Sequence, residues 1–572
     1  MAASSLDLFD DLKRSQESFH ALPPAKQLEV VLEGKGKERL DLLFLSENPK
    51  ELVSRLPELE IYLTLKEIGL KDGLDLISLT TAEQFQYLLD LDLWKKDQLD
   101  AEKALQWIEI LLEAGEEKVR EFVTASDLEW IALLLKKFIR VTTVEGEFLE
   151  MRDRIPLFTL DGYYFVDFKR SGTREIVQPL LESLASFDHD RYRRLMETQM
   201  METETELEES NYRLRSGRMA DHGFPEFEEA LEIYRFVNPD ALIDEKRTPL
   251  PHAETESEVP PFYLTFRKEG PFLSSVLSRV DNPSEMDRLK FEIASLCNKA
   301  MVAEAIDLFE IREMERVTRK VFHSLNLGLQ SLSSNDEVRA AEVLRMLSVQ
   351  KIFQAGIGAT LLLKKKAESI LRGTWFGGDR ENLLFLDPPH LERLQGILNR
   401  NPLILRNGMP EDFKDLRDLK EAETFLDMIE AVTIAFAERW KVGPETLKSL
   451  DLRESSPEAW RGITFSTILL TSLANWILEG AFLFKAVEKG RLKDLLPRIF
   501  DRDDRQKGVV RMEIRTGLRE WFDSTEGDEN RRLHLKAFGD FCLDLLEEEY
   551  GKISPEEEIE PRFVRGLLIS HS

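Results

Sequence analysis

Apolar residues recur at helical spacing in a run of short segments between Pro49 and Val141. In the segment Glu58 to Ile68, apolar side chains at spacings of four and three form one face, and Gly69 follows where a left-handed C-terminal cap is expected. Asn48 before Pro49 indicates a helix start, because Pro at the first helical position leaves no amide unpaired and Asn accepts a capping bond. The pattern therefore predicts successive amphipathic helices.

Three further cap signals separate the helices of this stretch. Thr81 with Gln84, and Ser126 with Glu129, have the spacing of a capping box, and Asp100 precedes a longer periodic segment. Each helix is too short to bury its apolar stripe alone, so neighbouring helices must stack. We expect an α-solenoid-like helical array.

The clearest β pattern follows the array. Pro156 to Leu160 and Tyr163 to Phe168 flank Asp161 and Gly162, a pair that suits the positive backbone angles of a tight turn. An isolated hairpin is marginally stable in water, so its aromatic side chains are expected to pack on helices. We interpret the hairpin as a brace between helical blocks; the alternative is a lid or a partner-binding edge.

The remainder of the chain is again helical in pattern. Glu226 to Phe236 is predicted as a helix with Phe227, Ala230, Leu231 and Tyr234 on one face. Other predicted helices cover Glu175 to Phe187, Asp190 to Tyr212, Ser284 to Leu325, Asp336 to Leu371, Pro389 to Asn399, Glu411 to Arg439, Pro457 to Leu483, Arg511 to Phe522 and Arg532 to Glu549. Long helices with short connections predict a bundle.

A change of composition marks the main boundary. Residues 244–261 mix four prolines with Thr, Ser and Glu, which predicts a linker, and Phe262 to Phe266 is predicted as a short extended piece after it. The predicted fold class is mainly α, with an N-terminal helical array, one small β-hairpin and a C-terminal helical bundle. The expected segments are a flexible N-terminus (1–22), the array (23–142), the hairpin brace (143–170), a helical segment (171–243), the linker (244–261), the bundle domain (262–550) and an acidic tail (551–572).

Composition narrows the class of partner. A formal net charge of −29 over 572 residues argues against a general nucleic-acid binder and against an anionic membrane surface, because both require a positive field. Cys297 and Cys542 lie far apart in apolar, helix-like contexts and are predicted to be reduced core residues. The first residues lack a basic start followed by an apolar core, so we expect a cytoplasmic protein.

One segment tests that expectation. Gly462 to Leu478 carries no formal charge and is the most apolar run of the chain. A membrane span needs about 20 predominantly apolar residues, whereas this run is shorter and includes Thr, Ser and Asn. We interpret it as a buried core helix; the alternative is a short membrane helix.

Motifs for catalysis are weak throughout. His189 with Asp190 resembles the central pair of metal-dependent phosphohydrolases, but no earlier histidine lies near enough in sequence, and a helix start with Asp190 as cap is favoured. Asp90, Asp92, Asp97 and Asp100 are clustered carboxylates, but they lack the ligand order and turn Gly of a Ca²⁺ loop. We therefore predict no catalytic residue and no metal ligand, and leave the cofactor open.

A basic group is notable in so acidic a chain. Arg213, Arg215 and Arg218 precede the Gly223 turn, and forked guanidinium groups suit phosphate or carboxylate. They are the candidate anion site. The favoured alternative is that neighbouring glutamates of the run Glu197 to Glu209 pair with these arginines.

Two resemblances follow from these residues. The prolines, glycines and leucine pairs at helix ends in the array resemble the cytosolic superhelical domain of MgtE-type magnesium transporters, which implies a helical array that senses ions or docks a partner. Over most of its length the chain resembles an uncharacterised domain-of-unknown-function family of anaerobic δ-proteobacteria, in Thr81 to Asp100 (TAEQFQYLLDLDLWKKDQLD), Gly223 to Tyr234 (GFPEFEEALEIY) and Gly462 to Leu478. This second resemblance implies a bacterial cytoplasmic setting and no particular activity.

Three functions are compatible with the sequence. The leading hypothesis is a non-catalytic cytoplasmic interaction or scaffold protein that binds a protein partner in the groove of the array. The alternative is an enzyme or sensor that binds a metal or a phosphate ligand, and a third is a membrane-associated regulator. The identity of the partner, the ligand and the oligomeric state stay open.

Overall fold

The computed structural model describes residues 19–143, 158–170, 172–243, 259–449, 462–502, 508–553 and 565–570. The chain forms two compact units. The first unit comprises Met1–Arg235, Lys246–Leu325 and Asp336–Gln354, and the second comprises Phe236–Glu245, Asn326–Asn335 and Ala355–Ser572. Across the described residues the chain is mainly helical and its sheets have two strands each, which confirms the predicted fold class.

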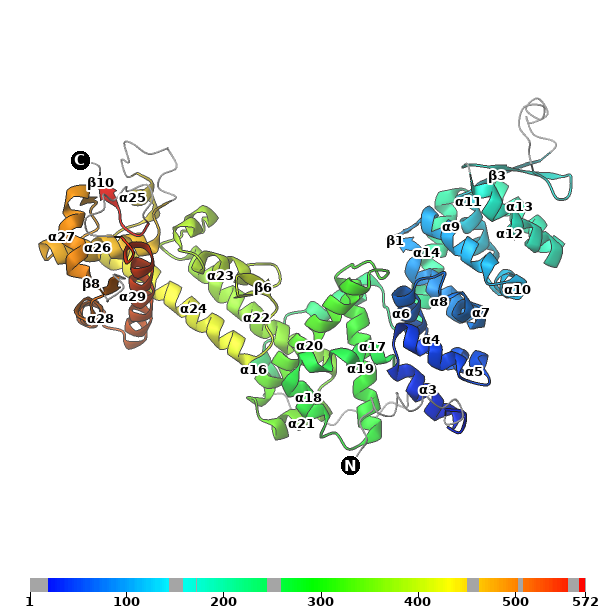
Figure 1. The fold of residues 1–572 in the computed structure, drawn as a ribbon, viewed down its shortest axis with the longest axis horizontal. Helices are drawn as coiled ribbons and strands as arrows, with labels where there is room; N and C mark the ends of the chain where they lie inside the picture. Colours follow the sequence, from blue (N-terminus) through cyan, green and yellow to red (C-terminus); the bar gives the residue numbers. More distant parts are fainter. Residues whose placement is uncertain are drawn as a thin grey trace, which may run out of the picture. The chain divides into compact units, whose positions relative to one another are not determined.

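The first unit begins with the helical array (Figure 1). Its helices are α3 (Pro24–Glu33), α4 (Gly36–Phe44), α5 (Pro49–Arg55), α6 (Glu58–Ile68), α7 (Leu74–Leu79), α8 (Ala82–Asp92), α9 (Ala101–Glu113), α10 (Glu116–Ala125) and α11 (Leu128–Lys136). A small hairpin of β1 (Trp94–Lys95) and β2 (Gln98–Leu99) joins α8 to α9. Pro49 starts α5 as predicted, but the Asn48 side chain makes no capping bond. Gly69 ends α6 with a positive φ of 95°, although its ψ of 145° is not that of the predicted left-handed cap.

Two of the predicted side-chain caps are present. Thr81 and Gln84 form a complete capping box on α8, and the Asp100 carboxylate accepts from the first amides of α9. The predicted box at Ser126 is wrong, because α10 extends far enough for the Ser126 amide to donate to the Phe122 carbonyl. Ser126 therefore ends α10, and α11 follows without a side-chain cap.

The strand predicted at the end of the hairpin is confirmed as β4 (Tyr164–Phe168). Its five-residue antiparallel partner is β3 (Ile139–Thr143), with Val141 opposite Val166. The predicted partner, Pro156 to Leu160, contributes one isolated bridge from Phe158, and its first two residues lie outside the described part. The predicted pairing is thus confirmed at Phe158 and Val166, which bond each other in both directions, at 3.1 and 2.7 Å. The sequence did not predict that β3, from the end of the array, pairs with β4 as well.

Helices complete the first unit. They are α12 (Thr173–Phe187), α13 (His189–Met201), α14 (Glu204–Asp221), α15 (Phe227–Leu231), η2 (Glu232–Tyr234), α17 (Pro261–Thr265), η3 (Phe266–Glu269), α18 (Pro271–Leu277), α19 (Pro283–Ala303), the first part of α20 (Ile311–Ser333), α21 (Glu337–Met346) and the start of α22 (Val349–Arg372). The cap of α13 is Asp188, not Asp190.

Three predicted segments that begin in this unit need correction. The piece Phe262 to Phe266 is helical, because Pro261 occupies the first position of α17 and its ring suits a helix start. The single helix predicted over Ser284 to Leu325 is α19 and α20, separated where Ala305 adopts φ 50°. Likewise Asp336 to Leu371 is divided between α21 and α22. A long apolar period does not reveal a short break.

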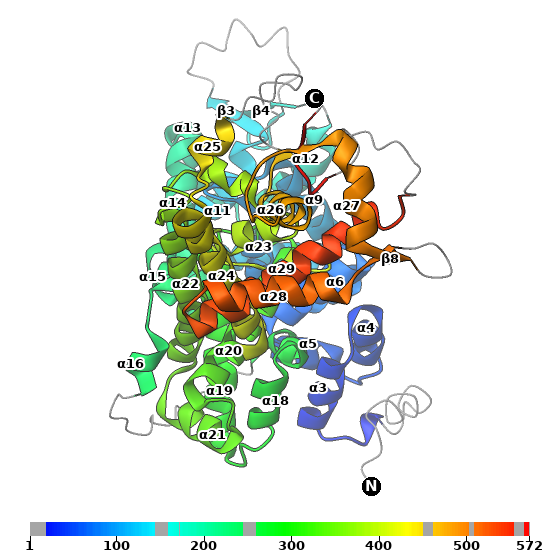
Figure 2. The same ribbon diagram turned by 90° about the vertical axis from the view of Figure 1, so that its left-hand side faces the viewer.

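The second unit is built around α26 (Phe465–Glu479), seen end-on in Figure 2. Every residue from Phe465 to Asn475 is buried, which confirms the prediction of a core helix in Gly462 to Leu478. The other elements are α16 (Pro239–Ile243), the ends of α20 and α22, η4 (Arg380–Phe385), α23 (His390–Ile397), β5 (Ile404–Arg406), β6 (Met409–Glu411), α24 (Leu416–Ala435), η5 (Phe436–Trp440), α25 (Pro444–Lys448), β7 (Val487–Glu488), η7 (Lys489–Arg491), α27 (Leu492–Ile499), β8 (Phe500–Arg502), β9 (Gly508–Val510), α28 (Met512–Thr525), α29 (Glu529–Tyr550) and β10 (Ile569–Ser570). Among the described helices, none has the length and apolarity needed to cross a membrane.

Two details of the second unit differ from the sequence pattern. The helix predicted from Glu411 begins at Leu416, because Asn407 and Gly408 turn the chain at φ 49° and 78° and the residues after them pair as β6. Within the predicted acidic tail, β10 pairs in parallel with β7, and the Leu568 amide donates to Thr471 of α26 at 2.9 Å. Cys297 in the first unit and Cys542 here are buried free thiols, as predicted.

The segment boundaries expected from the sequence stay predictions. Most of the N-terminal segment (1–18) and of the linker (244–258) lies outside the described residues, as do residues 554–564 and 571–572 of the tail.

Candidate functional site at the end of helix α8

The three predicted arginines lie on α14 and do not form one cluster. Arg218 makes a two-pronged contact with the Asp90 carboxylate, Nε to Oδ2 at 2.7 Å and Nη2 to Oδ1 at 2.9 Å. Arg215 donates from Nε to the Asp90 carbonyl at 2.8 Å. Arg213 is exposed and pairs with Glu209 one turn earlier. The structure therefore brings two of the three together, at Asp90 of another helix.

The Asp90 site is mostly shielded from solvent. Asp90 is 1% exposed, and Gln86 donates to its carboxylate at 3.1 Å. Burial opposes the charge of Arg218, but its hydrogen bonds to Asp90 outweigh that effect and raise its pKa. Burial lowers the pKa of Arg215, and its Nη groups have no hydrogen-bond partner among the described residues. Asp90 thus binds Arg218 through its carboxylate and Arg215 through its main-chain carbonyl.

A second carboxylate, Asp92, lies two residues further along α8 and collects a separate set of donors. Lys66 Nζ lies 2.6 Å and Lys103 Nζ 3.4 Å from Oδ1, and Trp107 Nε1 donates to Oδ2 at 2.8 Å. Tyr62 donates its hydroxyl at 3.4 Å. These donors come from α6 and α9, so Asp92 joins both helices to α8.

The charges around Asp92 decide its ionisation. Burial alone would raise the pKa of Asp92, but Lys66, Trp107 and Lys103 hold it below its ordinary value. Burial lowers the pKa of Lys103, against the attraction of Asp92. Burial and the nearby Asp92 charge raise the pKa of Tyr62. The carboxylate is accordingly a fixed negative charge saturated by its neighbours.

Three of the four clustered aspartates have a defined structural role. Asp90 and Asp92 are buried, and each forms ion pairs with cationic side chains of other helices. Asp100 instead caps α9 by accepting from the amides of Glu102 and Lys103. No group of three or more His, Cys, Asp or Glu residues in the described part of the chain is arranged to hold a metal ion. Chemically, the end of α8 is a cross-link between helices, with one incompletely bonded arginine beside it.

Sequence reasoning missed a comparable site at the start of the array. Arg39 of α4 is buried, and each of its guanidinium nitrogens donates: Nε to Val31, Nη1 to the Glu60 carbonyl and Thr64, Nη2 to Leu32. Nη2 also pairs with the Glu60 carboxylate at 2.7 Å. Glu60 then accepts from the Phe262 amide at 2.7 Å. The single signal in the sequence was an arginine on the apolar side of a predicted helix.

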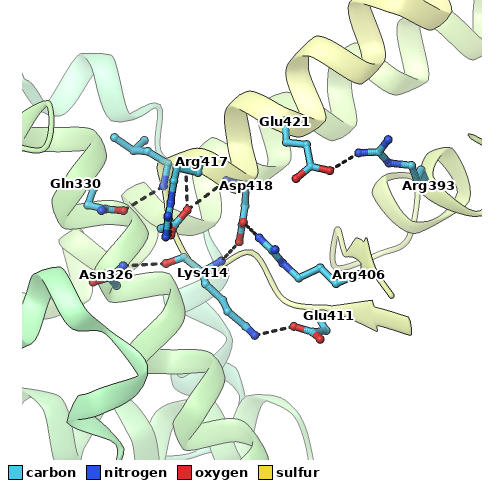
Figure 3. A network of polar contacts seen from close by, with 11 residues as sticks. Asn326, Gln330, Arg393, Arg406, Glu411, Lys414, Arg417, Asp418 and Glu421 are labelled. Atoms are coloured by element: carbon cyan, nitrogen blue, oxygen red, sulfur yellow. Dashed lines mark hydrogen bonds and ion pairs between the residues drawn. The ribbon is translucent and has the colours of Figure 1, made fainter. Parts of the chain in front are cut away.

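The second unit has its own polar network at the start of α24 (Figure 3). Asp418 is fully buried, pairs with Arg406 of β5 and accepts from the Lys414 amide at 2.7 Å. The C-terminal end of α20 contacts the same loop, where Asn326 donates to the Lys414 carbonyl and Gln330 accepts from Leu416. This network fixes the β5–β6 hairpin and α20 to α24.

A buried carboxylate that pairs with no cation among the described residues lies near α26. Asp387 is 5% exposed and accepts from the amide and the hydroxyl of Ser466. Burial raises its pKa, although the bonds from Ser466 and Thr464 act in the opposite direction. Nearby in sequence, His390 packs on Phe541 at 4.3 Å between ring centres, and burial, with Arg393, lowers its pKa to about 4.

The fold and these networks define a mainly helical protein of two units whose buried charges join its helices. Comparison with protein families assigns residues 16–570 to DUF6178, a family of unknown function, and the chain belongs to that family. This confirms the resemblance to an uncharacterised family. No curated protein and no solved structure matches the chain.

Proposed function

We propose that this protein is a non-catalytic cytoplasmic interaction or scaffold protein that binds another protein through its helical array. The observation that carries the proposal is the bonding of Asp90 and Asp92, the buried carboxylates that would be the first candidates for a catalytic or ligand-binding role in the array. Each is buried and bonded to cationic side chains from other helices of the same unit. Their role is to hold helices together, and no substrate is needed to explain them.

Cross-linked helices suit a binding surface. Arg39 joins α3, α4 and α6, and Asp92 joins α6, α8 and α9. A surface that is already ordered loses less conformational entropy when a partner binds. Helical arrays present such surfaces along many stacked helices, which is how solenoid proteins recognise other proteins. The resemblance of this region to the MgtE superhelical domain supports the same use.

Native mass spectrometry of the full-length protein, isolated gently from its own host, tests the proposal. We expect one stoichiometric protein partner and recovery from the soluble fraction without detergent. Recovery only with detergent would instead favour a membrane-associated regulator. A protein that carries no partner and turns over a small molecule would overturn the proposal.

A second candidate is a sensor that binds a phosphate or carboxylate ligand at the arginines of α14. The observation that favours it is the excess of positive charge where Arg215 and Arg218 share Asp90. Inorganic phosphate should then raise the melting temperature of the wild type but not that of the Arg215→Ala variant. Arg213→Ala is the matched control, since Arg213 contacts Glu209 instead. An equal phosphate effect in all three proteins excludes this site.

A further inference from the structure

Helix α15 presents an apolar pair to solvent that its sequence pattern assigned to the core. Phe227 is 45% exposed and Leu231, one turn later, is 37% exposed. The side chains that are fully buried in this segment are Ala230 and Ile233. The predicted apolar face of Phe227, Ala230, Leu231 and Tyr234 is therefore wrong, and half of it faces outward.

The orientation of α15 is fixed by contacts on its other side. Phe224, just before the helix, is 3% exposed, and Glu229 pairs with Lys299 of α19 at 3.3 Å. After the helix, the Tyr234 hydroxyl donates to Glu304 at 2.7 Å, and Gln354 donates to the Glu232 carbonyl at 2.9 Å. Rotating the helix to bury the exposed pair would break these contacts, so the pair stays on the surface.

Acidic side chains border the exposed pair. Glu226, Glu228 and Glu232 are exposed, and none of them has an ion-pair partner among the described residues. Glu228 and Glu232 are again one turn apart and form a stripe beside the one of Phe227 and Leu231. The surface therefore combines an apolar ridge with negative charge that the fold leaves uncompensated.

We propose that this surface, Phe227 and Leu231 with Glu226, Glu228 and Glu232, docks a basic amphipathic helix of the partner protein. The proposal rests on the proposed interaction function and names its surface. Apolar residues one turn apart match the spacing on a facing helix, and lysine or arginine beside them would complete the charges. Nucleic acid and anionic lipid are repelled by the same glutamates.

Fluorescence anisotropy with the full-length protein tests the surface directly. The probe is a labelled 18-residue peptide of leucine and lysine in helical periodicity, and its control has glutamate for every lysine. The wild type should bind the lysine peptide and not the glutamate peptide. Phe227→Ala with Leu231→Ala should weaken binding about tenfold or more, since two apolar contacts are removed. Neither residue belongs to the buried core, so a thermal melt should show an intact fold.

Charge reversal separates the surface from a general attraction to an acidic protein. Glu228→Lys with Glu232→Lys should abolish binding of the lysine peptide. The matched control reverses Glu113 and Glu117, which are also exposed, four residues apart and without an ion-pair partner in the described chain, but lie on α9 and α10. Equal losses in both variants, or wild-type binding by the alanine variant, would overturn the proposal.

Experiments with the natural partner separate the proposed α15 surface from the proposed interaction function. If native mass spectrometry finds a stoichiometric partner that the alanine variant also retains at full occupancy, the α15 surface is wrong and the interaction function stands. If the wild type carries no partner, the interaction function fails and the inference fails with it. Loss of that partner in the α15 variants alone supports both.

Discussion

The end of α8 and the core around α26 bury carboxylates in opposite ways. Asp92 in the first unit meets Lys66 and Lys103, and its pKa is lowered despite its burial. Asp387 in the second unit accepts from Ser466, and burial raises its pKa. Burial alone penalises the charged form, and only a nearby cation reverses the sign. The two carboxylates should consequently contribute to the pH dependence of stability with opposite signs.

The largest loss of stability is expected when the buried ion pair of Arg39 and Glu60 in the first unit is broken. Arg39→Met should cost about 3–5 kcal/mol of unfolding free energy, because Glu60 would stay buried without its partner. Urea denaturation measures the loss. Arg213→Met is the control, since its pair with Glu209 is exposed and should change stability by less than about 0.5 kcal/mol. Similar small losses in both would show that the Arg39 pair contributes little.

His390 tests the second unit without involving a cross-link. Its folded pKa of about 4 lies below the ordinary histidine value of 6.5, so the unfolded chain binds the proton first as pH falls. Protonation of His390 should therefore lower the unfolding free energy of the unit by about 3 kcal/mol between pH 6.5 and pH 4. It should cause no further loss below pH 4. In His390→Leu that part of the pH dependence should vanish. Denaturation series at several pH values measure it, and an unchanged slope would contradict the expectation.

Asp92→Asn tests the pH dependence of stability in the first unit. The folded pKa of Asp92 is lowered, so its stabilising effect is present above the unfolded value of 3.8 and is lost as pH falls through the folded pKa. Removing the charge should cost about 1.5–3 kcal/mol at pH 7, the value of hydrogen bonds to a charged group. The variant should approach the wild type in acid. A difference that does not shrink at low pH would exclude the ionic origin.

Asp387→Asn should give the smallest effect and the opposite trend. The folded pKa of Asp387 is raised, so its contribution to stability is present below the unfolded value of 3.8 and is lost as pH rises through the folded pKa. Stability of the variant relative to the wild type should therefore improve with rising pH, within about 1 kcal/mol, since an amide still accepts from Ser466. If the stability of the variant relative to the wild type fell with rising pH, the raised pKa of Asp387 would be contradicted.

What the sequence predicted correctly is mainly local. The capping box of Thr81 and Gln84 spans three residues, and the apolar run of α26 signals its own burial. Arg213 also follows a local rule, since its partner Glu209 lies one turn away. Spacing rules of this kind hold because the interacting groups lie on the same helix.

The remaining contacts depend on the fold. Arg218 was expected either to bind an anion or to pair with neighbouring glutamates, but its carboxylate is Asp90, 128 residues away. Glu60 and the Phe262 amide are 202 residues apart. For α15, periodicity predicted an apolar face, but it does not say which side the neighbouring helix α19 will cover. No single-sequence pattern carries that information.

The pairing of β10 with β7 has a consequence for synthesis of the chain. The Val487 amide donates to the Leu568 carbonyl, and the Leu568 amide donates to Thr471 in α26, so the core of the second unit includes a residue 97 positions after the helix residue that it contacts. The first unit needs nothing beyond Gln354 and is free to fold during translation. The α26 core, by contrast, cannot be completed until Leu568 has been synthesised, 97 residues after Thr471.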